Sequence, residues 1–207
     1  MDAATAINPR AVLKPQKPPR LYSLAEYLRM EARAEHKHEY QDGKIIKMPY
    51  ARGPHNIISA NIIALCHHLT MSLPKNYMVF SSDQLVYFPA LNHGAYADAL
   101  VVCEKPLYWD DDNLLLINPI LVVEVLSKST RKYDRAGKFD KYKTLESFRE
   151  YVLVEQDKPH VESWFREAPG LWRETVVNDI TDTLFLKSIG ISLPLAGVYR
   201  NIEFPAK

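Results

Sequence analysis

The stretch that decides the fold is Ile120–Leu126, which reads Ile-Leu-Val-Val-Glu-Val-Leu and follows Pro119. A continuous apolar run of this length is typical of a strand that is buried on both faces. Glu124 lies inside the run, where its carboxylate would lose its hydration without compensation. The sequence therefore predicts that Glu124 is protonated, paired with a cationic side chain or bound to a metal ion.

Asp98 opens a comparable apolar run that ends at Cys103. Side chains alternate between the two faces of a strand, so Asp98 shares a face with Leu100, and Glu124 shares one with Val122. If the two strands are neighbours, both carboxylates converge on one point. Mg²⁺ fits such a pair, because proteins usually hold it with one or two carboxylates plus water and phosphate oxygens. The alternative is structural: a strand-end aspartate, and a glutamate paired with a helix lysine.

The remaining pattern predicts an α/β (α+β) fold, a mixed central sheet flanked by helices with extra hairpins at both ends. A helix begins after Ser23, whose spacing to Glu26 is a capping box. Two further helices are expected over residues 54–73 and 130–144, and Asp42-Gly43 is typical of a tight hairpin turn. Extended segments are expected at 38–41, 44–48, 77–80, 84–88, 98–103, 120–126, 151–155, 161–166, 171–177 and 183–186.

Composition favours one domain of ordinary size, with 207 residues, 47% hydrophobic residues and a net charge of +1. Residues 1–20 carry prolines and basic side chains, so a flexible tail is expected there and a single domain over 21–207. The sequence holds neither a membrane-spanning apolar run nor a secretory signal, which predicts a cytoplasmic protein without membrane contact. Cys66 and Cys103 lack metal-ligand spacing and are expected to be small hydrophobic residues.

The window Lys128–Lys143 holds seven basic residues against two acidic ones, a local balance of +5. Such a run is commonly a solvated helix face, but it also suits phosphate binding. The candidates for contact with nucleic acid are Lys128, Arg131, Lys132, Arg135 and Lys141.

Several short motifs occur in a fixed order over residues 21–200. They are His38-Glu39-Tyr40-Gln41-Asp42-Gly43-Lys44, Pro54-His55, Tyr96-Ala97-Asp98, Val123-Glu124-Val125-Leu126-Ser127-Lys128-Ser129-Thr130, Tyr133-Asp134-Arg135, Lys138-Phe139 and Glu150-Tyr151. Together they resemble the Uma-type "putative restriction endonuclease" family of the PD-(D/E)XK nuclease superfamily. The resemblance implies a restriction-endonuclease-like fold and a Mg²⁺- or Mn²⁺-dependent site that hydrolyses phosphodiester bonds. It also implies nucleic acid, in the first place DNA, as the substrate and a homodimer as the assembly.

Carried over residue by residue, the resemblance makes Asp98, Glu124 and Glu39 the metal ligands and Lys138 the catalytic lysine. Two prolines of the family pattern are replaced by Ala97 and Lys128. The position of the superfamily's E-x-K lysine is held by Leu126, so a lysine must arrive from elsewhere. Lys138 is expected to reach the carboxylates along its aliphatic stem, whereas Lys128 is expected to follow the end of the strand toward solvent.

Three classes of function remain open at this point. The first is a metal-dependent endonuclease, which the joint presence of Asp98, Glu124 and Lys138 favours. The second is a non-catalytic module that keeps the nuclease fold and binds nucleic acid or a protein. The third, a small-molecule metallohydrolase, lacks a histidine-rich ligand set: His67-His68 has no third ligand at metal spacing, and His55 is expected to cap or pack a helix.

Overall fold

The apolar run around Glu124 forms a central strand of a six-stranded mixed sheet in the computed structural model, which describes residues 20–204. The strands of this sheet, in spatial order, are β11 (Leu171–Val177), β10 (Val161–Ala168), β9 (Glu150–Glu155), β8 (Leu121–Leu126), β6 (Ala99–Cys103) and β3 (Tyr77–Ser81). β8 and β9 are parallel, and the other neighbours are antiparallel. All six residues of β8 are buried, as a continuous apolar run predicts.

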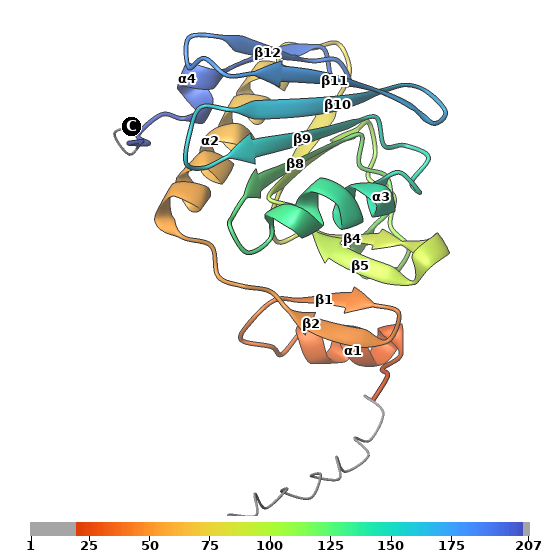
Figure 1. The fold of residues 1–207 in the computed structure, drawn as a ribbon. Helices are drawn as coiled ribbons and strands as arrows, with labels where there is room; N and C mark the ends of the chain where they lie inside the picture. The colour runs from red at the N-terminus through yellow and green to blue at the C-terminus, as the bar shows by residue number, and fades with distance from the viewer. Residues whose placement is uncertain (1–19, 205–207) are drawn as a thin grey trace, which may run out of the picture.

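A second sheet of five strands lies beside the first (Figure 1). Its order is β2 (Lys44–Lys47), β1 (His38–Gln41), β5 (His93–Tyr96), β4 (Leu85–Phe88) and β7 (Leu115–Leu116). The predicted hairpin turn is confirmed, since Asp42 and Gly43 both have positive φ, at 45° and 87°. The hairpin does not stand alone, however, because β1 also pairs with β5 and so joins the N-terminal segment to the middle of the chain.

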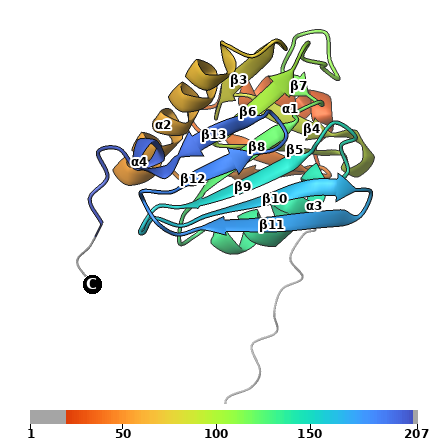
Figure 2. The ribbon, with the colours of Figure 1, turned by 90° about the horizontal axis from the view of Figure 1, so that it is seen from above.

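Helices cover both faces of the six-stranded sheet (Figure 2). On one face, α2 (Gly53–Thr70) packs through Ile58, Ile62 and Cys66, together with α4 (Leu195–Val198) and the hairpin of β12 (Thr183–Leu186) and β13 (Ile191–Pro194). On the other face, η2 (Tyr133–Lys138) runs directly into α3 (Phe139–Tyr142). The remaining helices are α1 (Leu24–Glu31), with the predicted capping box, and the short η1 (Pro89–Leu91).

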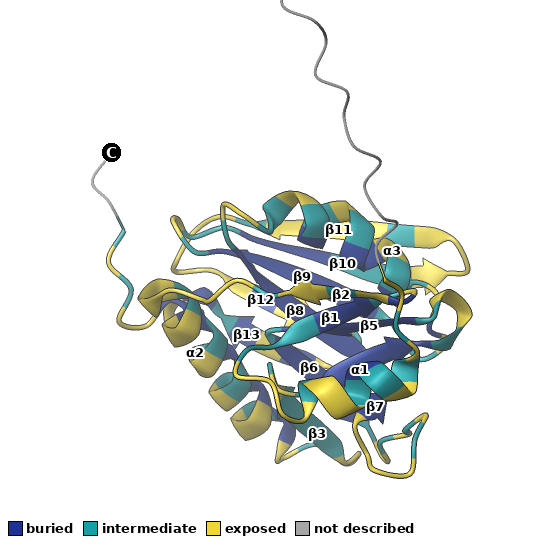
Figure 3. Ribbon diagram, turned by 90° about the horizontal axis from the view of Figure 1, so that it is seen from below, coloured by how far each residue is buried: buried dark blue, intermediate teal, exposed yellow. Residues whose placement is uncertain are grey.

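The predicted fold class is confirmed, and most predicted strands occur within one or two residues of their expected positions. The helix predicted over residues 130–144 is present, but its six residues Tyr133–Lys138 form a π-helix instead of regular α-helical turns. The pattern also missed the strands β5, β7 and β13 and the short helices η1 and α4. β5 reads His-Gly-Ala-Tyr, without β-branched residues, yet all four residues are buried by the neighbouring strands (Figure 3).

No helix within residues 20–204 is long and apolar enough to span a membrane. The tail expected at residues 1–20 lies outside the described residues except for Arg20, which pairs with Glu26 of α1. Both cysteines are free thiols, and Cys66 is buried in the core as expected.

Candidate functional site

The two carboxylates that the sequence singled out lie opposite each other, Asp98 directly before β6 and Glu124 within the adjacent strand β8. Asp98 is in the turn that leads into β6, and the register pairs Ala99 with Val123, so Asp98 stands opposite Glu124 of β8. Glu124 faces the cluster formed by Leu100, Val122, Leu126 and their neighbours, on the side of the sheet that η2 and α3 cover. The backbone N–H of Val125 donates to Asp98 Oδ2 at 2.7 Å, which fixes the aspartate against the end of β8.

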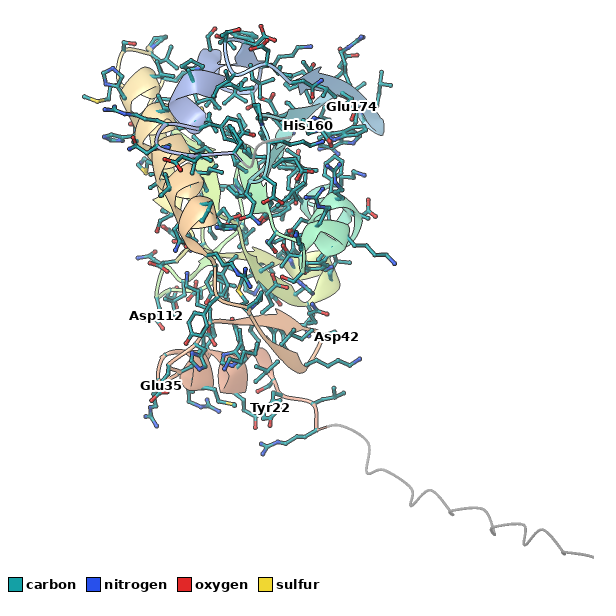
Figure 4. All side chains as sticks on the ribbon, turned by 60° about the vertical axis from the view of Figure 1, so that its left-hand side comes forward. Tyr22, Glu35, Asp42, Asp112, His160 and Glu174 are labelled. Carbon is teal, nitrogen blue, oxygen red and sulfur yellow. The ribbon has the colours of Figure 1, made fainter. Side chains whose placement is uncertain are left out.

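Asp98 and Glu124 line a cleft of about 870 Å³ between the N-terminal residues 35–56 and the six-stranded sheet. One wall comes from residues 35–37 and 48–56, and the other from residues 124–130 and 156–157. Figure 4 labels Glu35, which lines the first wall, near one end of the molecule and His160, which does not line the cleft, near the other end. A concave polar site between two parts of a fold is a usual place for a ligand.

Lys138 of η2 completes the floor of this cleft. Its Nζ lies 2.8 Å from Glu124 Oε1 and 3.8 Å from Asp134 Oδ1, and all three side chains are at most 5% exposed. Burial alone would lower the pKa of Lys138, but the charges of Glu124 and Asp134 raise it overall, so the ammonium stays protonated. Burial raises the pKa of Glu124, and only Lys138 opposes that effect strongly.

The Lys138–Glu124 pair is what both interpretations of the sequence predicted. A purely structural ion pair and a catalytic lysine beside a metal ligand would both show this contact, so the contact alone does not separate the two interpretations. The expected departure of Lys128 toward solvent is also observed, because β8 ends at Leu126 and the N–H of Thr130 donates to Ser127 Oγ at 3.2 Å. Leu126 itself is fully buried in the core, so the E-x-K position supplies no polar group.

The π-helical geometry of η2 determines which side chains reach the floor of the cleft. π-helical turns are rare and often occur at functional sites. Here Asp134 and Lys138 face Glu124, while Tyr133 turns toward the second sheet and donates its hydroxyl to Glu39 Oε2 at 2.8 Å. Gly137 permits this arrangement, since a Cβ there would lie 3.1 Å from Cδ2 of Tyr133.

Glu39 is close to the site but does not line the cleft. It is only 5% exposed, in contrast to the solvent-facing position that is ordinary for a glutamate in a hairpin. Its carboxylate is held by Tyr133, and His93 Nε2 lies 3.4 Å from the same hydroxyl. The structure therefore places Glu39 behind Lys138, as one more negative charge that raises the pKa of that lysine.

His55, which was expected to cap or pack a helix, contacts the candidate site directly. It lies in the first turn of α2, with Nε2 at 3.2 Å from Asp98 Oδ2. Burial lowers the pKa of His55, but the hydrogen bond and charge of Asp98 and the charge of Asp134 raise it overall. In the sequence, only the Pro54-His55 motif pointed to a role of His55 in the site. A lone histidine at the start of a helix has no spacing that predicts its contact with Asp98, 43 positions away.

The donors present fit a hard divalent ion held by two carboxylates. Glu124 Oε1 is buried, and its contact with Lys138 lacks the alignment of a hydrogen bond, which leaves acceptor capacity for a ligand. No cluster of three or more His, Cys, Asp or Glu side chains in residues 20–204 has the arrangement of a complete metal site. Mg²⁺ does not need one, because water and phosphate oxygens usually complete its shell.

Two arginines of the basic window are paired with carboxylates rather than free. Arg131 and Arg135 bind Glu155 of β9, and Arg135 also binds Glu162 of β10 through two hydrogen bonds of 2.6 and 2.9 Å. Fork-to-fork pairs of this kind are strong and directional. The two side chains therefore attach η2 to the central sheet, and a phosphate would have to displace a buried glutamate to bind them.

The other candidates for phosphate contact differ in their surroundings. Lys128 and Lys132 are exposed, and only Lys128 lines the cleft. Lys141 lies over the ring of Tyr133 and donates to the carbonyl of Gly137 at 3.0 Å.

Comparisons with known proteins agree with this architecture. The sequence pattern of the Uma2 family, described as "Putative restriction endonuclease", matches residues 24–196. Two relatives from Synechocystis sp. are similar: "Uncharacterized protein slr1290" is 34% identical over 182 residues (86% of this chain and 92% of the relative), and "Uncharacterized protein sll1609" is 30% identical over 154 residues (74% and 85%). A crystal structure described as "a putative nuclease belonging to DUF820" from Anabaena variabilis superposes with a TM-score of 0.68 at 18% identity, covering 86% of this chain and 97% of that one.

Proposed function

Because this chain belongs to the family described as "Putative restriction endonuclease", we propose that it is a Mg²⁺- or Mn²⁺-dependent endonuclease that hydrolyses phosphodiester bonds in DNA. The observation that carries the proposal is the convergence of Asp98, Glu124 and Lys138 at the floor of one cleft. These residues come from a turn, a strand and a helix, and they are the three types that metal-assisted phosphoryl chemistry uses.

Asp98 and Glu124 are the residues that would hold the divalent ion. Such an ion, when bound, lowers the pKa of a water molecule and polarises a phosphoryl oxygen. The Val125 N–H and His55 both contact Oδ2 of Asp98 and orient this carboxylate, which leaves its Oδ1 as an acceptor for the ion. Orienting contacts of this kind tune the ligands of a metal site.

Lys138 contributes a fixed positive charge where negative charge develops on the phosphate. Its ammonium is already desolvated and held by Glu124 and Asp134, so little reorganisation is needed during the reaction. Glu39 could act as a further metal ligand, as the resemblance implies, only by exchanging the Tyr133 hydroxyl for the ion. Its role in the geometry described is to keep Tyr133 and Lys138 in place.

The test is cleavage of supercoiled plasmid and of single-stranded DNA with Mg²⁺, Mn²⁺ or no divalent ion. We expect cleavage only with a divalent ion, and loss of at least about 100-fold in rate for Asp98→Asn and Glu124→Gln. Asp140→Asn is the matched control, because Asp140 is exposed on α3 and pairs only with Lys143. Binding of DNA without any cleavage would assign the chain to the alternative class, a non-catalytic module with the nuclease fold.

A second measurement tests the ion independently of activity. Mg²⁺ that binds the folded state should raise the free energy of unfolding by mass action. We expect this stabilisation in the unchanged protein and in Asp140→Asn, and its loss in Asp98→Asn.

A homodimer is part of the same proposal. Its support is the exposed apolar side chains on the last strands of the fold, Leu171, Val176 and Phe185. Light scattering on the purified protein measures the assembly directly, and a monomer at all concentrations would exclude it.

A further inference from the structure

The side chains at the floor of the cleft are almost completely buried, which disfavours a rigid ligand. Glu124 and Lys138 are each 3% exposed, and they lie between the segment 48–56 and the segment 127–130. Stacked base pairs give a duplex a stiff surface, whereas a single strand can bend its backbone and turn its bases outward. A phosphate that reaches Glu124 between these two walls therefore belongs most easily to an unpaired segment.

The charge around the cleft is also small for a duplex. Within residues 20–204, Arg52 and Lys128 line the rim without an ion pair or side-chain hydrogen bond. Lys37 on the same rim is paired with Asp83 at 2.5 Å. Proteins that bind duplex DNA through its backbone neutralise many phosphates, whereas single-strand binders combine fewer cations with aromatic stacking.

Tyr50 supplies an aromatic face at this rim. It lines the cleft and is 77% exposed, the most exposed large hydrophobic side chain within residues 20–204. Its ring is nevertheless fixed, because the hydroxyl bonds His36 Nδ1 and the two rings meet edge to face at 5.1 Å between centroids. An exposed ring that is held in place loses little conformational entropy when a base stacks on it.

The first turn of α2 lies next to Tyr50 and favours a phosphate there. Arg52 is the N-cap residue, no side chain caps the helix, and a Cβ at Gly53 would meet no atom within 4 Å. Pro54 has no N–H and the Asn56 N–H is bonded to the Arg52 carbonyl, so Gly53 and His55 carry the N–H groups of this 18-residue helix that lack an acceptor within the helix. Helix N-termini with free N–H groups attract anions.

We infer that the cleft takes an unpaired segment of nucleic acid, with a base stacked on Tyr50 and flanking phosphates at Arg52 and Lys128. This inference rests on the proposed function and names the substrate class of the same site. The substrates it predicts are single strands and the unpaired parts of a duplex, such as flaps, bulges or frayed ends.

The test is binding without divalent ions, so that no strand is cut. The probes are a single-stranded oligonucleotide of about 12 residues, a length suited to single-strand sites, and the same sequence as a duplex, both carrying the fluorescent base 2-aminopurine. The single strand should bind more tightly and its fluorescence should be quenched by stacking. Tyr50→Ala should weaken single-strand binding by about 5-fold to 150-fold, the usual worth of one stacked base.

Two variants control for the loss of a ring and of a hydroxyl. Tyr50→Phe keeps the ring and should retain most of the affinity. Trp109→Ala removes a ring that is 57% exposed and does not line the cleft, and it should change nothing. Tighter binding of the duplex, or an unchanged affinity in Tyr50→Ala, would overturn the inference. Binding that depends on Tyr50 in a protein that cuts no DNA would uphold the inference and refute only the nuclease activity.

Discussion

Lys138 is almost completely buried, which is unusual for a charged lysine, and the neighbouring carboxylates explain why it stays protonated. Four carboxylates raise its pKa against the effect of burial: Glu124, Asp134, Glu39 and Asp98. Removing the ammonium would leave Glu124 buried without compensation. Breaking a buried ion pair in this way usually costs about 3–5 kcal/mol of stability.

We predict that Lys138→Ala abolishes metal-dependent cleavage and also lowers the free energy of unfolding by about 3–5 kcal/mol. The double variant Lys138→Met with Glu124→Gln removes both charges and should recover most of that stability while remaining inactive. Lys128→Ala should weaken only substrate binding. Cleavage rates and urea unfolding curves of the three proteins check the prediction, and full activity in Lys138→Ala would reverse the assignment.

His93, which does not line the cleft, makes the stability of the fold sensitive to acid. Burial, together with the charges of Lys141 and Lys138, lowers the pKa of His93 to about 4. The unfolded chain binds this proton with a pKa near 6.5, so between these values the unfolded state holds more protons. Stability is therefore lost as the pH falls through this window.

We predict that His93 removes about 2 kcal/mol of stability between pH 7 and pH 5. The measurement is urea unfolding at both pH values for the unchanged protein and for His93→Gln. The variant lacks the titrating group, so its loss on acidification should be smaller by that amount. Equal losses in the two proteins would mean that His93 titrates normally in the folded state.

At the scale of single residues, the sequence predicted the carboxylates well and their partners less well. Asp98 and Glu124 stood out because apolar strands rarely carry carboxylates. His55 and Asp134 did not, since their contacts depend on a fold that brings α2 and η2 to the same strand ends. The catalytic roles of these residues stay predictions until cleavage is measured.

Among the elements, η2 is the one whose geometry matters most to the site. Its π-helical turns direct Asp134 and Lys138 toward Glu124, while Phe139 of α3 stacks on Tyr151 of the central sheet at 4.8 Å between ring centroids. The basic, apolar and glycine residues of this window predicted a helix correctly. They did not predict its π-helical turns or the contacts of its side chains with distant strands, where Tyr133 bonds Glu39 and Arg135 bonds Glu162.

We predict that Gly137→Ala lowers the free energy of unfolding by about 1 kcal/mol. A Cβ at this position meets the Tyr133 ring at 3.1 Å, and the cost of that overlap exceeds the gain from replacing a helical glycine. Gly53→Ala is the matched control, since its Cβ meets nothing within 4 Å and the change should be neutral or slightly stabilising. Thermal unfolding of both variants measures the difference.

For the molecule as a whole, net charge and ion pairing limit how strongly it can attract a polyanion. The net charge is +1, and the arginines of the basic window are paired with Glu155 and Glu162. The local charge balance alone favoured a broad phosphate-binding face. Pairing between distant segments, which the sequence does not reveal, leaves Arg52 and Lys128 as the exposed cations that line the cleft within residues 20–204.

We predict a modest salt dependence for single-strand binding. With two or three phosphates neutralised, the logarithm of affinity should fall with the logarithm of salt concentration with a slope of about −1.5 to −2. Lys128→Ala should reduce the slope by about 0.7, whereas Lys75→Ala, which is exposed beyond the C-terminal end of α2 and does not line the cleft, should leave it unchanged. A slope near −5 would show that the paired arginines open to bind phosphate.

The pairing of β1 with β5, and of Glu39 with Tyr133 across 94 positions, has a consequence for how the protein is made. One wall of the cleft is synthesised early and the other late, so contacts of long sequence separation must form before the site exists. A nascent chain that has not yet released Lys138 from the ribosome holds Asp98 and Glu124 but not the charge that completes the floor. The nuclease activity proposed above therefore requires that the chain has emerged at least as far as Lys138.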